Sequence, residues 1–213
     1  MVRYLLSIFL VAINIISFAQ SSDLDYSDTR KKNESFAKLQ NKEVRTDLAG
    51  FALAGVDESI FKLELKKIPY SEYGPDFMTF EGEGIKATVN TAPFVTGKHK
   101  LDYDDKYLIK IDKKTYYGGY GKMPVTLISK ISMTIDGDSV VIPPTAYFDL
   151  YNLNFAFKDI AGTKRSTNGI YRSRDGHRVY LYLFCKDSSG SYEVTFVIQD
   201  KKYAFRVLDY GFM

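Results

Sequence analysis

The side chains that most often carry catalysis or bind metals are scarce in this sequence. Its 213 residues include two histidines, one cysteine and no tryptophan. His177 follows an Asp-Gly turn signal and His99 lies between two lysines, so we expect both imidazoles to be solvated. Cys185 falls in phase with the apolar residues of a predicted strand, where a small apolar side chain is expected to be buried and inert. Catalytic triads and metal cages that need several His or Cys residues are therefore nearly excluded.

Carboxylates are the remaining candidates for chemistry. Asp102, Asp104 and Asp105 lie close together in the stretch LDYDDKY, and oxygen donors of this kind bind calcium. The cluster does not follow the spacing of an EF-hand loop, so a calcium site is a hypothesis and no other cofactor is expected. Two carboxylates that face each other across a cleft would instead support hydrolysis of a glycosidic polymer, but the sequence does not single out such a pair.

Aromatic side chains are abundant, with 17 tyrosines and 15 phenylalanines. One face of a predicted strand carries Tyr180, Tyr182 and Phe184, and neighbouring strands are expected to bring Glu193 and Arg206 to the same face. Exposed rings stack on sugars or peptides while charged neighbours bind polar groups, so this face is a candidate binding surface. In the alternative interpretation the face packs against residues 34–57 or a second sheet, and the further apolar residues on it favour this alternative.

A second candidate is the segment 116–121, which is rich in glycine and tyrosine. Tyr117 and Tyr120 alternate with glycines there, so the loop is able to present flat aromatic surface. The glycines lack the strand-turn-helix context of a dinucleotide-binding loop. The segment is either a binding loop or a tight turn whose tyrosines cover the edge of the core, and we favour the turn.

The first 19 residues differ from the rest of the chain and are typical of a secretory signal peptide. Arg3 precedes an apolar run of about 15 residues, shorter than the roughly 20 that cross a membrane as a helix. Small residues precede Gln20, so we expect cleavage between Ala19 and Gln20 and a secreted or periplasmic product without a stable membrane span. An uncleaved N-terminal anchor is the alternative.

The charge balance argues against a nucleic-acid partner. The chain has 29 basic and 26 acidic side chains, which gives a formal net charge of +3. Such a small excess, spread along the sequence, provides no strong attraction to a polyanion. We therefore expect the partner to be an envelope or extracellular polymer or a protein.

The elements that must position these residues are mainly strands. Residues 20–33 are polar and predict a flexible lead-in, and residues 34–57 predict one or two short helices. Residues 60–66 alternate with a period of two and predict a strand, and Asp136-Gly137 predicts a tight hairpin. Many short strands without βαβ alternation favour one domain over 34–213, an antiparallel β-sandwich or open barrel with a short helical N-terminal element.

The register of a C-terminal three-stranded meander follows from its alternation. Pairing Lys186 with Ser191, and Ile198 with Tyr203, keeps the side-chain faces of the three strands aligned. The core face then contains Val179, Leu181, Leu183, Cys185, Tyr192, Val194, Phe196, Ile198, Tyr203, Phe205 and Val207. The opposite face contains Tyr180, Tyr182, Phe184, Glu193, Thr195, Val197, Ala204, Arg206 and Leu208.

These observations predict an exported, non-enzymatic β domain that binds a partner or polymer at or outside the cell envelope. The alternative is a hydrolase that acts on an envelope or extracellular polymer through Asp/Glu pairs. A third hypothesis is a structural protein whose sheet edges pair with another chain.

Overall fold

The structure is a computed structural model that describes residues 28–61, 64–186 and 191–212. The predicted signal peptide and residues 20–27 of the predicted lead-in lie outside the described residues. The described chain is mainly β, as predicted, and its two main sheets are antiparallel, five-stranded and open. No helix among the described residues is long and apolar enough to cross a membrane.

The first sheet contains the predicted meander at its centre and one edge. Ile198 pairs with Tyr203 and Cys185 pairs with Tyr192, in the predicted register. Asp200 and Lys201 both adopt positive φ, which closes a two-residue turn between the last two strands. In spatial order the strands are β1 (Lys67–Ile68), β11 (Gly169–Arg172), β12 (Arg178–Cys185), β13 (Ser191–Gln199) and β14 (Lys202–Phe212).

A β-bulge in β14 makes part of the predicted face assignment wrong. Val197 pairs with Phe205 and Ile198 pairs with Tyr203, so Ala204 is one extra residue in β14. One extra residue reverses the side-chain alternation beyond it. Phe205 and Val207, predicted on the core face, therefore pack on the outer face, and Arg206 and Leu208 move to the opposite side.

The second sheet is built around two tight hairpins. Asp136 and Gly137 adopt φ of 51° and 87° and join β7 to β8, which confirms the predicted Asp-Gly hairpin. Its strands lie in the order β2 (Tyr70–Tyr73), β3 (Phe77–Gly82), β4 (Ile85–Pro93), β7 (Thr126–Ile135) and β8 (Asp138–Val140).

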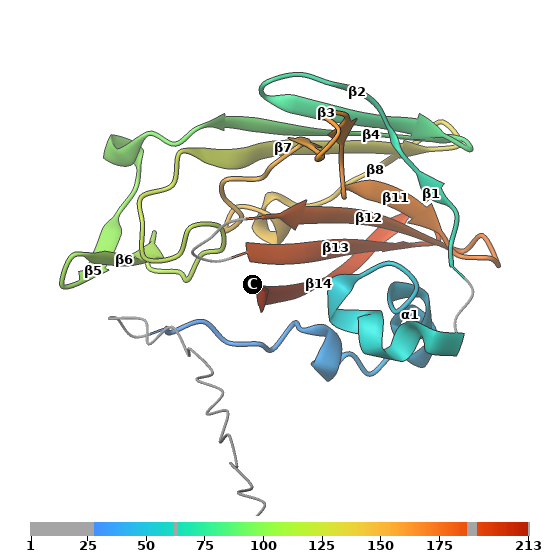
Figure 1. The fold of residues 1–213 in the computed structure, drawn as a ribbon, viewed down its shortest axis with the longest axis horizontal. Helices are drawn as coiled ribbons and strands as arrows, with labels where there is room; N and C mark the ends of the chain where they lie inside the picture. The colour runs from blue at the N-terminus through green and yellow to red at the C-terminus, as the bar shows by residue number, and fades with distance from the viewer. Residues whose placement is uncertain (1–27, 62–63, 187–190, 213) are drawn as a thin grey trace, which may run out of the picture.

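The inner faces of the two sheets pack against each other (Figure 1). Alternate residues of the strands supply this core, which includes Met78, Phe80, Val89, Met133, Leu181, Leu183, Val194 and Phe196. Cys185 belongs to the core, as predicted. Two small hairpins lie outside the main sheets, β5 (Leu101–Asp104) with β6 (Tyr107–Ile111), and β9 (Phe157–Lys158) with β10 (Lys164–Arg165).

The N-terminal element covers the outer face of the first sheet, on the side away from the second sheet (Figure 1). It contains the 3-10 helix η1 (Phe36–Lys38), the helix α1 (Lys42–Leu48) and the 3-10 helix η2 (Leu53–Phe61), which confirms the predicted helical segment. The strand predicted over 60–66 is wrong, because η2 continues through Phe61 and residues 64–66 belong to no strand. Further along the chain lie the 3-10 helices η3 (Thr96–Lys98) and η4 (Pro144–Ala146).

Candidate binding site

The aromatic strip predicted on β12 is covered by the N-terminal element. Tyr180 and Tyr182 are 0% and 3% exposed, and they pack with Phe51, Val44 and Leu48 in an apolar cluster. The prediction of an open binding surface is therefore wrong at these two tyrosines, and the alternative in which residues 34–57 cover them is what the structure shows. The physical reason is that these apolar rings and an amphipathic helix each bury their surface against the other.

Glu193 fastens this cover to the sheet instead of facing solvent. Its carboxylate accepts hydrogen bonds from the backbone N–H groups of Leu53 (2.8 Å) and Ala54 (2.7 Å) and from the Tyr182 hydroxyl (2.7 Å). Burial raises the pKa of Glu193 above its usual value, against the opposing effect of these hydrogen bonds. The neighbouring β14 carboxylate, Asp209, accepts the Phe36 N–H at 2.7 Å. Both carboxylates hold backbone amides of the N-terminal element, so this pair offers no support for a hydrolytic centre.

Arg206 does not join the predicted surface, because the β14 bulge turns it to the other face. Its guanidinium lies 2.6 and 2.8 Å from the two carboxylate oxygens of Asp149, and it also donates to Glu34 and to the Ala146 carbonyl. Burial alone would lower the pKa of Arg206. The adjacent carboxylates of Asp149 and Glu34 outweigh this effect and raise the pKa above its usual value, so the guanidinium stays charged. Arg206 thus ties the loop after η4 to β14.

Tyr117 and Tyr120 are buried rather than presented at a loop surface. They are 6% and 0% exposed, and Gly118 between them has a φ of 95°. Tyr117 lies beside Tyr210 of β14 at a ring-centroid distance of 5.5 Å. The turn interpretation therefore holds for the burial of both tyrosines. Tyr117 belongs to the core between the sheets with Tyr210, and Tyr120 belongs to a separate apolar cluster with Tyr116 and Tyr151.

The aspartates proposed as calcium ligands lie on the exposed β5–β6 hairpin. Asp102 and Asp104 belong to β5, and Asp105 occupies the turn with a φ of 51°. No group of three His, Cys, Asp or Glu side chains that could hold a metal ion occurs among the described residues. The structure therefore does not gather the calcium cluster that the sequence suggested.

Phe184 is the residue of the predicted strip that reaches a cavity. This cavity of about 590 Å³ lies at the end of β12 to β14 nearest η2, and we call it the end cavity. Its apolar walls come from Leu53, Phe155, Phe157, Phe184 and Phe212. The volume lies within the range of about 300–1,000 Å³ that is usual for small-molecule sites.

Polar contacts hold one wall of the end cavity in place. Asn168 is buried, donates to the carbonyls of Asn154 (2.9 Å) and Phe155 (3.2 Å), and accepts the Phe184 N–H at 2.7 Å. Ser166 donates to the same Phe155 carbonyl at 2.6 Å. The segment 154–158 is thereby attached to β12, although it belongs to neither main sheet, and its phenylalanines form a fixed wall.

The charges at the end cavity have one sign among the described lining residues. Lys158 and Lys186 line it, and none of the described lining residues is a carboxylate. Both lysines are exposed, so their ammonium groups can stay solvated until a ligand arrives. An apolar interior beside ammonium groups suits a molecule with an apolar body and an acidic group.

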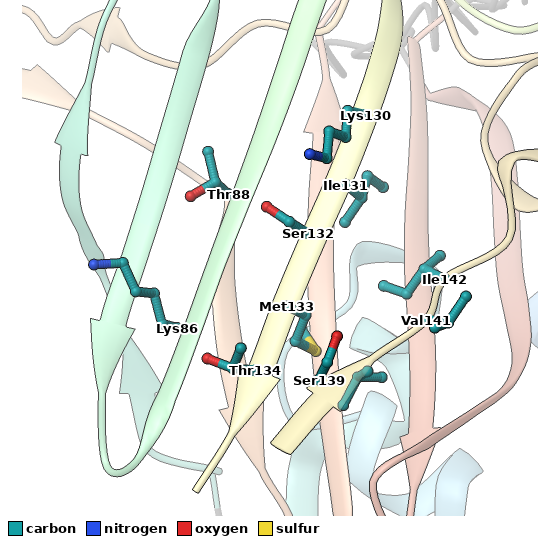
Figure 2. A pocket seen from close by; sticks show the side chains of 11 residues that line it. Lys86, Thr88, Lys130, Ile131, Ser132, Met133, Thr134, Ser139, Val141 and Ile142 are labelled. Atoms are coloured by element: carbon teal, nitrogen blue, oxygen red, sulfur yellow. The ribbon is translucent and has the colours of Figure 1, made fainter. Parts of the chain in front are cut away.

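A second hollow lies beside β4, β7, β8 and the segment that follows β8 (Figure 2). It has a volume of about 410 Å³. Lysines and hydroxyl-bearing side chains of β4, β7 and β8 line it together with aliphatic side chains of β7, β8 and the segment after β8, which include Ile131, Met133, Val141 and Ile142. Lys86 is already paired with Glu81 at 3.0 Å. This hollow provides no aromatic wall, and the end cavity is the better candidate site.

Most of the end cavity was missed by reasoning from the sequence. Its apolar walls come from three distant parts of the chain other than β12, represented by Leu53, by Phe155 with Phe157, and by Phe212. Only Phe184 was a predicted site residue. One local signal was present, because Phe155 and Phe157 alternate in the stretch NLNFAF although that stretch lacks strand partners in the main sheets. No protein-family model, curated protein or solved structure matches the chain.

Proposed function

We propose that this chain is an exported, non-enzymatic binding protein whose end cavity holds an apolar molecule with an acidic group. The observation that carries the proposal is an aromatic-walled cavity of about 590 Å³ with two exposed lysines and no carboxylate among its described lining residues. The signal-peptide pattern of residues 1–19 supports export to the periplasm or beyond. This ligand is either a free molecule or a part of a larger envelope component. In both cases an acyl chain or aromatic ring enters the cavity and the acidic group lies at its mouth.

Binding in this cavity would be driven mainly by burial of apolar surface. Phe157 is 49% exposed and Leu53 is 43% exposed, so a ligand that covers them removes apolar area from water. The lysines then add orientation, because an acidic group at the mouth lies near ammonium groups while the apolar body points inward. Catalysis is not needed to explain any of these residues.

The experiment is a binding titration of the chain with two probes, anilinonaphthalene sulfonate and palmitate. We expect Phe157→Ala to weaken binding of both probes about tenfold, because the aromatic wall is lost. The double variant Lys158→Glu, Lys186→Glu should weaken binding by a similar factor of about ten, and uncharged dodecanol should be much less affected by it.

Matched substitutions on the second sheet serve as controls. Val141 is 76% exposed and Lys130 lies on the outer face of β7, so Val141→Ala and Lys130→Glu change the same chemistry away from the end cavity. These controls should bind both probes like the unaltered chain. Equal affinity of the Phe157 and Val141 variants for both probes would show that the end cavity is not the site.

A further inference from the structure

Arg30 occupies an aromatic cage, a position that the polar composition of the lead-in did not reveal. Its guanidinium carbon lies 4.1 Å from the ring centroid of Tyr120, 4.2 Å from that of Tyr210 and 6.0 Å from that of Tyr117. The Arg30 side chain is only 4% exposed. The three rings thus form a site that attracts a planar cation through their faces, which we call the tyrosine cage.

The tyrosine cage is built by the domain and does not depend on Arg30 for its shape. Tyr120 and Tyr117 are fixed by the turn at Gly118, and the adjacent Tyr116 hydroxyl lies 2.8 Å from the Lys122 carbonyl. Tyr210 belongs to β14 and is held by the sheet ladder. The cage would therefore keep its form if its occupant changed.

The segment that delivers Arg30 is weakly attached. We call residues 28–33 the strap. Among the described residues, the first backbone hydrogen bond from this end of the chain to β14 is made by Leu208 N–H to the Glu34 carbonyl, beyond the strap. Within the strap, Thr29 contacts the Tyr120 hydroxyl at 3.2 Å and Lys32 lies 5.0 Å from the centroid of Tyr210. Arg30 is thus the main anchor of the strap.

The counter-ion of Arg30 comes from the strap and not from the cage. The Asp28 carboxylate accepts the Arg30 backbone N–H at 2.9 Å and two guanidinium N–H groups at 2.9 and 2.8 Å. The recognised unit is therefore a compact Asp-x-Arg turn, in which the peptide supplies its own charge balance. Among the described residues, one guanidinium nitrogen, Nη1 of Arg30, is buried without a hydrogen-bond partner, so the cage supplies no acceptor for this donor and Arg30 is held there at a cost in free energy.

We propose that the tyrosine cage is a docking site for an arginine in an Asp-x-Arg turn of a partner protein, and that Arg30 fills it in the absence of that partner. Displacing the strap would expose the part of β14 that lies beside it. Next to this part, the Leu208 N–H already donates to the Glu34 carbonyl, so β14 can pair with an added segment of chain. A partner peptide then competes with Arg30 for the cage. The apparent affinity of the peptide equals its intrinsic affinity multiplied by the fraction of molecules in which the cage is open.

The test uses the full chain and a fluorescein-labelled peptide with the sequence of residues 28–34, followed by fluorescence anisotropy. We expect the Arg30→Ala variant to bind this peptide at least tenfold more tightly than the unaltered chain, because its cage is empty. A peptide with lysine in place of arginine should bind at least tenfold more weakly, because an ammonium does not stack on the rings as a planar guanidinium does. Arg165→Ala, which removes an exposed arginine paired with Asp159, is the matched control and should behave like the unaltered chain.

A second readout guards against a folding defect in the variant. Free N-acetyl-arginine amide should raise the melting temperature of Arg30→Ala, and N-acetyl-lysine amide should not. Equal peptide binding by Arg30→Ala and the unaltered chain, or equal binding of the arginine and lysine peptides, would overturn the proposal. A concentration-dependent dimer that Arg30→Ala abolishes would also overturn it, because the occupant would then be the strap of a second copy.

Discussion

The Tyr182 hydroxyl donates a 2.7 Å hydrogen bond to the Glu193 carboxylate, and both residues are 3% exposed beneath the N-terminal element. The same carboxylate accepts two backbone N–H groups from the start of η2. A single buried side chain therefore links β12, β13 and the helical cover. Burial raises the pKa of Tyr182 far above its usual range, so its hydroxyl stays protonated and able to donate.

Removal of this carboxylate should destabilise the protein strongly. Glu193→Ala leaves the buried Tyr182 hydroxyl and two partly buried backbone N–H groups without an acceptor, and we expect it to lower the free energy of unfolding by about 3 kcal/mol. Tyr182→Phe removes one donor and should cost about 1 kcal/mol. Urea unfolding followed by circular dichroism measures both changes. Tyr103→Phe, at a half-exposed tyrosine, is the control, and a Glu193→Ala loss as small as the control value would contradict this role.

The buried carboxylates predict an unusual pH dependence of stability. Burial raises the pKa of Glu193 above 4.5 and that of Asp209 above 3.8, despite their hydrogen bonds. A raised pKa in the folded state gives stability that is fully present below the unfolded value and is lost as the pH rises through the folded value. Glu193→Gln mimics the protonated form. The free energy of unfolding of the unaltered chain minus that of Glu193→Gln should therefore be largest near pH 4 and should decrease toward pH 7.

Urea titrations of the two chains at several pH values between 4 and 7 test this expectation. Exposed aspartates such as Asp175, whose pKa is lowered by a hydrogen bond from Ser173, act in the opposite direction in both chains and cancel in the difference. A difference that is constant or that grows with pH would be incompatible with a raised pKa at Glu193.

Two glycines with similar positive φ, Gly118 at 95° and Gly137 at 87°, should respond differently to alanine. A Cβ at Gly118 would lie 2.1 Å from the Tyr151 carbonyl oxygen, whereas at Gly137 it would meet no described atom within 4 Å. Both have positive φ, which costs a non-glycine residue roughly 1–2 kcal/mol. We expect Gly137→Ala to lose about 1 kcal/mol and Gly118→Ala at least about 3 kcal/mol, because backbone must also move. Thermal unfolding of both variants measures this difference, and equal losses would contradict it.

Cys185 should be unreactive in the folded protein. It is 1% exposed, and its Sγ lies 3.0 Å from the Asn152 carbonyl oxygen in the core between the sheets. A buried thiol in apolar surroundings is a poor nucleophile because the thiolate is disfavoured. Ellman's reagent should therefore label no thiol in the native chain and one thiol in urea. Rapid labelling without denaturant would contradict the burial.

Several local features of this protein follow from its amino-acid sequence alone. The Asp136-Gly137 hairpin follows from residues that tolerate positive φ, and the register of β12 and β13 follows from uninterrupted alternation of apolar side chains. The buried position of Cys185 follows from the same alternation. These features depend on neighbouring residues or on pairing across a short turn, and the mainly β architecture is their sum.

The positions of the remaining side chains depend on long-range contacts in the folded chain. The bulge at Ala204 has no composition signal, yet it turned Arg206 away from the predicted surface and toward Asp149. The cover over Tyr182 joins segments 140 residues apart, and the strap that carries Arg30 contacts Tyr120 from 91 residues away. The walls of the end cavity likewise come from distant segments, from Leu53 to Phe212. Alternation reports that a side chain leaves the plane of a sheet, but whether solvent or another segment meets it depends on contacts that no local pattern encodes.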